Sequence, residues 1–107
     1  MPKPPYDGWV ADLDLGDDHA LSWTCWKPDR ELNPGYADLP DVERLGALIP
    51  HGTCCGSVMF DEPATARLFP DHPKWKVESW EPLTLSPSIL CRLCGDHGFI
   101  KQGKWIR

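Results

Sequence analysis

Apolar and polar residues alternate along the first quarter of the chain in the manner of β-strands. Between residues 9 and 15, apolar side chains occupy every second position and acidic ones stand between most of them, which is typical of a half-buried strand. Residues 20–26 repeat the alternation, with Leu21, Trp23 and Cys25 on one side. The Gly-Asp-Asp sequence between the two segments is typical of a turn. The pattern predicts an N-terminal β-hairpin.

A different spacing follows the proline-rich stretch at residues 27–40, which we expect to be a loop. Val42, Leu45 and Leu48 are three residues apart, so that they would share one face of a helix. Asp41 precedes them and belongs to the residue types that cap helices. The spacing predicts a short helix that begins at Asp41 and ends at Leu48.

The second half of the chain contains further strand patterns. We expect strands over three segments, Ser57–Phe60, Trp75–Trp80 and Leu83–Leu85. The last ten residues predict a hairpin, because a glycine supplies the positive φ angle that a tight turn at Gln102-Gly103 needs. Such a turn would place Ile100 opposite Trp105. The fold class is therefore expected to be mainly β, a small β-rich α+β protein of antiparallel strands with one short helix.

Length and composition fit one small domain over residues 1–107. A chain of 107 residues buries only a modest core. Its twelve prolines cut helices short, and its six tryptophans can fill a core that has few aliphatic residues. No apolar segment resembles a signal peptide or a membrane span, so we expect a cytoplasmic protein without a membrane partner.

Five cysteines are the strongest chemical signal. In a reducing cytoplasm, cysteines serve better as metal ligands than as disulfides. Cys91 and Cys94 form a Cys-x-x-Cys pair followed by Gly95, which is the pattern of a zinc knuckle or zinc ribbon, and His97 lies three residues further on. Two thiolates at this spacing can bind one ion around a tight turn. The sequence therefore predicts a Zn²⁺ ion that stabilises the domain.

A structural zinc ion needs four ligands, and we expect the second group between His51 and Gly56. Cys55-Gly56 repeats the Cys94-Gly95 pattern, which favours Cys55 over Cys54. Adjacent cysteines in an extended chain point in opposite directions, so only one of the two is expected to serve. The expected set is Cys55, Cys91, Cys94 and His97, or the same set with His51 in place of His97, and Cys54 remains an alternative to Cys55.

Other candidate residues are assigned less specific roles. Cys25 is expected in the core, because it shares the apolar side of its strand pattern. His19 and His72 lie beside aspartates in turn-like segments and are expected at the solvated surface. The aspartates between residues 12 and 18 lack the ligand spacing of a calcium-binding loop.

Catalytic zinc motifs are missing from the sequence. It has neither the His-x-Glu and Pro-Cys-x-x-Cys pair of zinc deaminases nor the His-Glu-x-x-His of metalloproteases. Four protein ligands would leave no coordination position for a substrate. We therefore expect a structural zinc ion and no enzyme activity.

Charge is unevenly distributed along the chain, whose net charge is −5. Residues 1–62 contain twelve acidic and four basic side chains, whereas residues 63–107 contain four acidic and seven basic ones. The acidic part disfavours nucleic acid. The terminal hairpin nevertheless mixes Phe99 and Trp105 with basic residues, as stacking and phosphate-binding surfaces do. We expect a protein partner, with a small nucleic-acid-binding zinc-ribbon protein as the alternative.

Three motifs near the C-terminus carry a resemblance to a known family. They are LTLSPSI at residues 83–89, CGDHGFI at 94–100 and GKW at 103–105. Together they resemble the C-terminal signature of a family of small uncharacterised proteins found in bacteria and bacteriophages, mainly phages of actinobacteria. The resemblance spans residues 46–107, although family members usually carry a Cys-x-x-His or Cys-x-Cys-like group where this chain has His51 and Cys54-Cys55. It implies that Cys94 and His97 belong to a shared pattern and to a metal site. The family has no established activity. The acidic front half, the many tryptophans and the missing catalytic motifs lead us to expect a phage accessory factor that binds a host or phage protein.

Overall fold

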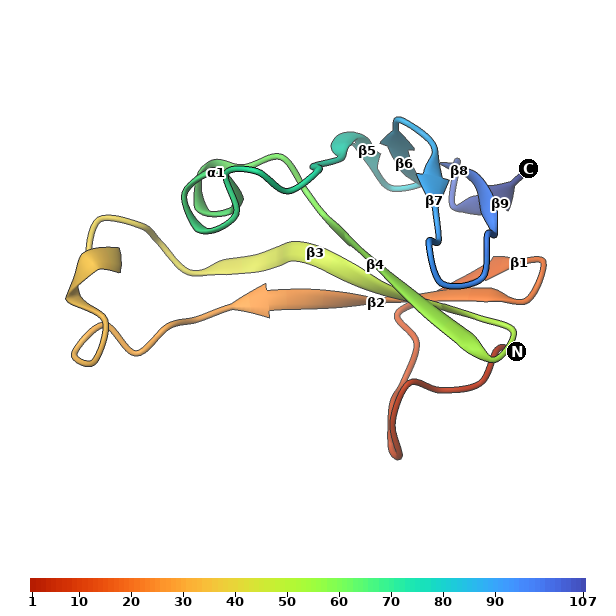
Figure 1. The fold of residues 1–107 in the computed structure, drawn as a ribbon, viewed down its shortest axis with the longest axis horizontal. Coiled ribbons are helices and arrows are strands. Elements are labelled where there is room, and N and C mark those ends of the chain that lie inside the picture. The colour runs from red at the N-terminus through yellow and green to blue at the C-terminus, as the bar shows by residue number, and fades with distance from the viewer.

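The computed structural model describes residues 1–107 and contains nine β-strands, one α-helix and one 3-10 helix (Figure 1). The elements are β1 (Leu13–Gly16), β2 (His19–Trp26), η1 (Pro34–Tyr36), β3 (Val42–His51), β4 (Cys54–Met59), α1 (Pro63–Leu68), β5 (Lys76–Trp80), β6 (Leu83–Ser86), β7 (Ile89–Leu90), β8 (His97–Lys101) and β9 (Lys104–Ile106). Strands β1 to β4 form one antiparallel sheet in sequence order. Two smaller antiparallel sheets contain β5-β6 and β7-β8-β9.

The two smaller sheets lie across one face of the four-stranded sheet (Figure 1). Apolar side chains from both layers meet between them and form the main core. The eleven buried residues of this core are Leu15, Leu21, Ala47, Ile49, Val58, Phe60, Leu83, Leu85, Ile89, Ile100 and Trp105. The predicted mainly β fold class with antiparallel strands and one short helix is therefore confirmed.

Strand β3 replaces the helix predicted for residues 41–48, and that prediction was wrong. Leu45, Ala47 and Ile49 are buried at every second position, which is the periodicity of a strand rather than of a helix. Gly46 allows β4 to approach closely, because a Cβ atom there would lie 2.2 Å from the Val58 carbonyl oxygen. A glycine inside a strand often marks such a close approach. The position of β3 between two neighbouring strands therefore outweighs the three-residue spacing.

The predicted hairpins are both present. β1 pairs with β2 at the N-terminus, although β1 begins at Leu13 instead of residue 9. In the terminal hairpin, Ile100 lies opposite Trp105 across the predicted turn, and Gly103 has a φ angle of 76°. The three other predicted strands lie at β4, β5 and β6, and their ends differ from the predicted ones by at most three residues.

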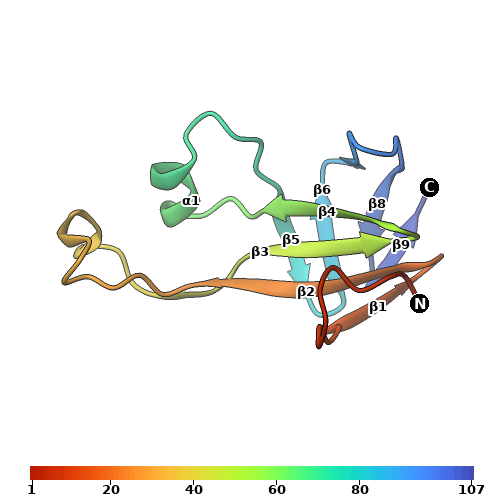
Figure 2. The ribbon, with the colours of Figure 1, turned by 60° about the horizontal axis from the view of Figure 1, so that its bottom comes forward.

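Strands β2 and β3 continue together beyond the small sheets and carry the loop that contains η1 (Figure 2). A second, smaller cluster of buried residues lies there, formed by Leu39, Leu45 and Ala64. The helix α1, which the sequence pattern did not predict, supplies Ala64. Glu62 caps this helix by accepting a hydrogen bond from the Ala64 amide, and six residues are too few to show a helical period. No helix of the chain is long and apolar enough to cross a membrane.

Candidate metal centre

The turn between β3 and β4 brings the first two metal-binding side chains together. His51 ends β3, Cys54 begins β4, and the two residues lie directly opposite each other in the antiparallel pair. Opposed residues of an antiparallel pair share one face of the sheet. That face is the inner one, because His51 continues the alternation of buried Ala47 and Ile49. The hairpin therefore presents an imidazole and a thiol to the same space.

The Cys-x-x-Cys segment folds as a tight loop between β7 and β8, as predicted for a knuckle. The Gly95 amide donates to the Cys91 carbonyl over 2.7 Å, and the Cys91 amide donates to the Asp96 carbonyl over 2.8 Å. Gly95 has a φ angle of 80°, a conformation that favours glycine. We call residues 91–96 the knuckle loop. Its hydrogen bonds hold Cys91 and Cys94 at one end of the molecule.

Four ligand atoms from these two segments converge. The atoms are one nitrogen of His51 and the sulfurs of Cys54, Cys91 and Cys94, and all lie within 4.8 Å of one another. We call these four residues the metal cluster. All five cysteines are free, so no disulfide competes for the sulfurs.

Individual distances within the metal cluster match a tetrahedral ion. Cys54 Sγ and Cys91 Sγ are 3.7 Å apart, whereas two sulfurs bound at tetrahedral angles to one zinc ion would be about 3.8 Å apart. His51 Nε2 lies 3.2 Å from Cys94 Sγ, slightly closer than the roughly 3.6 Å expected for a nitrogen and a sulfur on the same ion. The side chains present therefore fit a four-coordinate metal with only small movements.

A backbone contact orients the His51 ring for metal binding. Its Nδ1 lies 2.8 Å from the Ile49 carbonyl oxygen. A carbonyl accepts only, so Nδ1 carries the proton and donates, which leaves a lone pair on Nε2. A metal-binding histidine usually donates its other ring nitrogen to such an acceptor. The ring is only 7% exposed, and its orientation is therefore held by both packing and hydrogen bonding.

The pKa values of Cys54 and Cys91 are shifted in opposite directions, because their sulfurs lie close together. Burial raises the pKa of Cys91, but backbone amides of Cys94 and Leu93 that hydrogen-bond its sulfur outweigh this effect and lower the pKa to about 6. The neighbouring Cys91 sulfur, helped by burial, raises the pKa of Cys54 to about 11. One thiolate thus forms readily while its neighbour keeps its proton. A divalent cation among the sulfurs would offset the repulsion between neighbouring thiolates.

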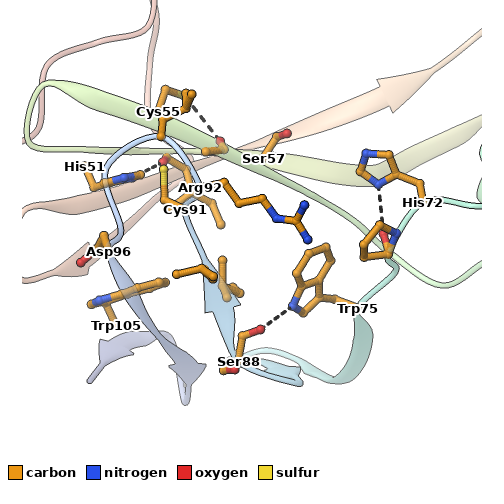
Figure 3. A pocket seen from close by; sticks show the side chains of 16 residues that line it. His51, Cys55, Ser57, His72, Trp75, Ser88, Cys91, Arg92, Asp96 and Trp105 are labelled. Atoms are coloured by element: carbon orange, nitrogen blue, oxygen red, sulfur yellow. Dashed lines mark hydrogen bonds between the residues drawn. The ribbon is translucent and has the colours of Figure 1, made fainter.

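Two residues of the expected ligand set lie outside the metal cluster. Cys55 is next to Cys54 in an extended strand, so its side chain points to the other side and its sulfur contacts the Gly56 carbonyl at 3.5 Å. His97 is exposed, and its Nε2 lies 2.9 Å from the Ser88 hydroxyl. Its neighbour Gly98 faces inward, so His97 faces outward. Figure 3 shows His51 beside Cys91, with Cys55 above them in this view.

A second layer of side chains supports the metal cluster, and it includes His19, which the sequence analysis placed at the surface. That prediction was wrong: His19 is 3% exposed, lies opposite His51 in the sheet and stacks between His51 and Trp105. Its Nε2 donates to Asp96 Oδ2 over 2.5 Å. Arg107 donates to the other oxygen of Asp96 over 2.6 Å. The knuckle loop is thereby tied to β2 and to the C-terminus.

The two remaining candidate residues, Cys25 and His72, do not belong to the metal cluster. Cys25 is exposed on β2, so the expectation of a core position was wrong. A register irregularity between Thr24 and Trp26 interrupts the pairing there, which breaks the alternation on which the expectation rested. His72 is exposed, as predicted.

Comparisons with protein-family models, curated proteins and solved structures gave no match to this chain. The assignment of the site therefore rests on the residues of the metal cluster and on their geometry. They are one imidazole and three thiols that could bind a metal ion.

Proposed function

We propose that the protein is a small zinc-binding protein in which a structural zinc ion on His51, Cys54, Cys91 and Cys94 shapes a surface for a protein partner. One observation carries the metal assignment. Four ligand atoms from segments about forty residues apart lie within 4.8 Å of one another, and the imidazole among them has its free nitrogen directed to the sulfurs.

The donor set favours zinc over other metals. Three thiolates and one neutral imidazole form a common structural zinc site, and tetrahedral sulfur-rich sites select soft or borderline metals over Mg²⁺ and Ca²⁺. All four positions would be filled by protein, so that no position is left to activate water. When bound, the ion would supply charge neutralisation for the thiolates and a cross-link between the β3–β4 turn and the knuckle loop.

A protein partner is supported by exposed apolar side chains in the knuckle loop and in the strand β7 that precedes it. Leu93 is 83% exposed and Leu90 is 54% exposed, and exposed apolar groups that lie together mark interaction surfaces. The nucleic-acid alternative depended on stacking by Phe99 and Trp105. Trp105 is only 7% exposed and is already stacked on His19, which weakens that alternative. The resemblance to a family of small uncharacterised proteins found mainly in phages of actinobacteria makes a phage or host protein the proposed partner.

Adjacent cysteines offer a matched test of the metal assignment. Protein purified without added metal should contain about one equivalent of zinc by elemental analysis. Cys54→Ser should lose zinc, whereas Cys55→Ser, one residue away, should retain it. The same contrast is expected between His51→Ala and His97→Ala.

Replacement of zinc by Co²⁺ gives a second readout, because cobalt bound to three thiolates in a tetrahedral site absorbs strongly in the visible range. Zinc retention by Cys54→Ser together with loss in Cys55→Ser would contradict the proposed ligand set. Wild-type protein that contains no metal and yet folds would contradict the zinc function as a whole.

A further inference from the structure

The knuckle loop forms one wall of a cavity of about 630 Å³ beside the metal cluster (Figure 3). Ile49 and Ile89, which are both buried, line it, and Trp75 lies across from Cys91 (Figure 3). Leu90, at the end of β7, and Leu93, in the knuckle loop, also line it. The volume falls within the range of pockets that hold a ligand or a large side chain. The cavity is thus an apolar space that opens next to exposed leucines.

One cation in this lining has no partner within the protein. Arg92 extends from the knuckle loop into the space between Ser57 and Trp75 (Figure 3). No hydrogen bond, ion pair or aromatic contact holds its guanidinium. Three of the other four arginines pair with aspartates, and Arg44 packs over the Trp23 ring at 4.3 Å.

The cavity offers no internal acid to neutralise Arg92. Asp96 is the only acidic residue in the lining. Its two carboxylate oxygens already accept hydrogen bonds from His19 and Arg107. An unpaired guanidinium beside an apolar wall is therefore complementary to a carboxylate carried by an apolar body.

We propose that this cavity docks an extended peptide segment of a partner protein in which a large apolar residue is flanked by Asp or Glu. The apolar side chain enters between Trp75 and Ile89, and the neighbouring carboxylate pairs with Arg92. Leu90 and Leu93 are 54% and 83% exposed, so that they extend the apolar lining outward, where adjacent residues of the peptide cover them. This continuation favours a chain over a small molecule that would fill the cavity alone.

The proposal rests on the proposed zinc function, because the metal cluster holds the loop that carries Arg92 and Leu93. The docking proposal also specifies which kinds of side chain the partner presents, which the proposed zinc function alone does not. A partner that presents acidic and apolar residues fits the lining, whereas a basic or purely polar segment would leave Arg92 unpaired or repelled.

Titration of zinc-loaded, ¹⁵N-labelled protein with defined peptides tests the proposal. The probes are eight-residue peptides with a central Phe flanked by Glu, and matched peptides with Lys in place of Glu, at up to about 1 mM. We expect the Glu peptide to shift the Trp75 indole signal and the Arg92 and Leu93 amides, and to bind at least tenfold more tightly than the Lys peptide.

Charge reversal supplies the matched variants. Arg92→Glu should reverse the preference toward the Lys peptide, whereas Lys104→Glu makes the same change of charge on β9, outside the cavity, and should leave the preference unchanged. Zinc content and the amide spectrum of each variant show that the knuckle loop is intact. Equal effects of the two variants would mean unspecific attraction and would overturn the proposal.

Other outcomes separate the docking surface from the metal site. Zinc-loaded, folded protein that binds neither peptide at about 1 mM would overturn the docking proposal and leave the zinc function standing. Binding of 3-phenylpropionate in the same cavity as tightly as the Glu peptide would show a small-molecule anion site instead. Absence of zinc from the wild-type protein would contradict the proposed function itself.

Discussion

Strands β2 and β3 pair from the metal cluster to the base of the η1 loop, and the two ends of this pair are held in different ways (Figure 2). At one end, His19 lies opposite His51, and the surrounding side chains are polar groups of the metal cluster and its second layer, among which His19, His51 and Cys91 are buried. At the other end, Trp26 lies opposite Val42. There the contacts are a small apolar cluster of three buried residues and ion pairs at the surface.

The contrast shows how a small domain concentrates its stability. Buried polar groups are destabilising unless every one of them has a partner, so the metal end depends on the ion and on Asp96 together. The far end depends on weaker contacts that act separately, since exposed ion pairs contribute little. Disruption of the metal end should therefore unfold much of the domain, whereas changes at the far end should remain local.

Metal removal should have the largest effect. Chelation by EDTA should lower Tm by roughly 20 °C or more, because the binding energy of a structural zinc ion is also folding energy. Hydrogen exchange sharpens the comparison. The amide of Gly95, which donates to Cys91, should lose protection before the amide of Phe69, which donates to Thr65 at the far end. If the chelated protein melted within a few degrees of the native one, the stability of the metal end would not depend on the ion.

Asp96→Asn tests the second layer with an intermediate effect. The neutral amide cannot satisfy both His19 and Arg107, and His19 would remain buried beside it. We expect the free energy of unfolding to fall by about 1–3 kcal/mol in urea denaturation. Asp71→Asn changes the same charge at an exposed turn and should have no measurable effect. Equal stability of the two variants would show that the second layer does not support the metal end.

The carboxyl group of Asp38 at the far end should titrate at low pH, and its protonation should change the free energy of unfolding only slightly. Its hydrogen bonds with Arg67 lower the pKa of the carboxyl from 3.8 to about 2. Any stability from this pair is present above pH 3.8 and is lost as the pH falls toward 2. Carboxyl NMR should find the low pKa in the wild-type protein and a return toward 3.8 in Arg67→Met. An unchanged pKa in the variant would mean that the pair does not form in solution.

Strand periodicity explains most of what the sequence could predict. The terminal hairpin was predicted with its register, because Gln102-Gly103 fixes the turn and the apolar residues alternate around it. The same reasoning identified the Cys91–Cys94 loop, where glycine and spacing are local features. At residues 41–48 two periodicities competed, and only pairing with β2 and β4 decided for the strand.

The same strand alternation could have decided between the alternative zinc ligands. Val58 is buried and lies four residues after Cys54, so Cys54 and not Cys55 shares its face. A similar count from buried Ile49 places His51 on the inner face. The role of His19 could not be predicted, since it depends on the registry of β2 against β3 and on the stack with Trp105. Such contacts join segments far apart in the chain and leave no local signal.

X-ray absorption at the zinc edge of the purified wild-type protein tests the central claim most directly. The metal cluster predicts a first shell of three sulfurs at about 2.3 Å and one nitrogen at about 2.0–2.1 Å, with the outer-shell scattering of a single imidazole. A shell of two sulfurs and two nitrogens, or one dominated by oxygen, would contradict the assignment of His51, Cys54, Cys91 and Cys94.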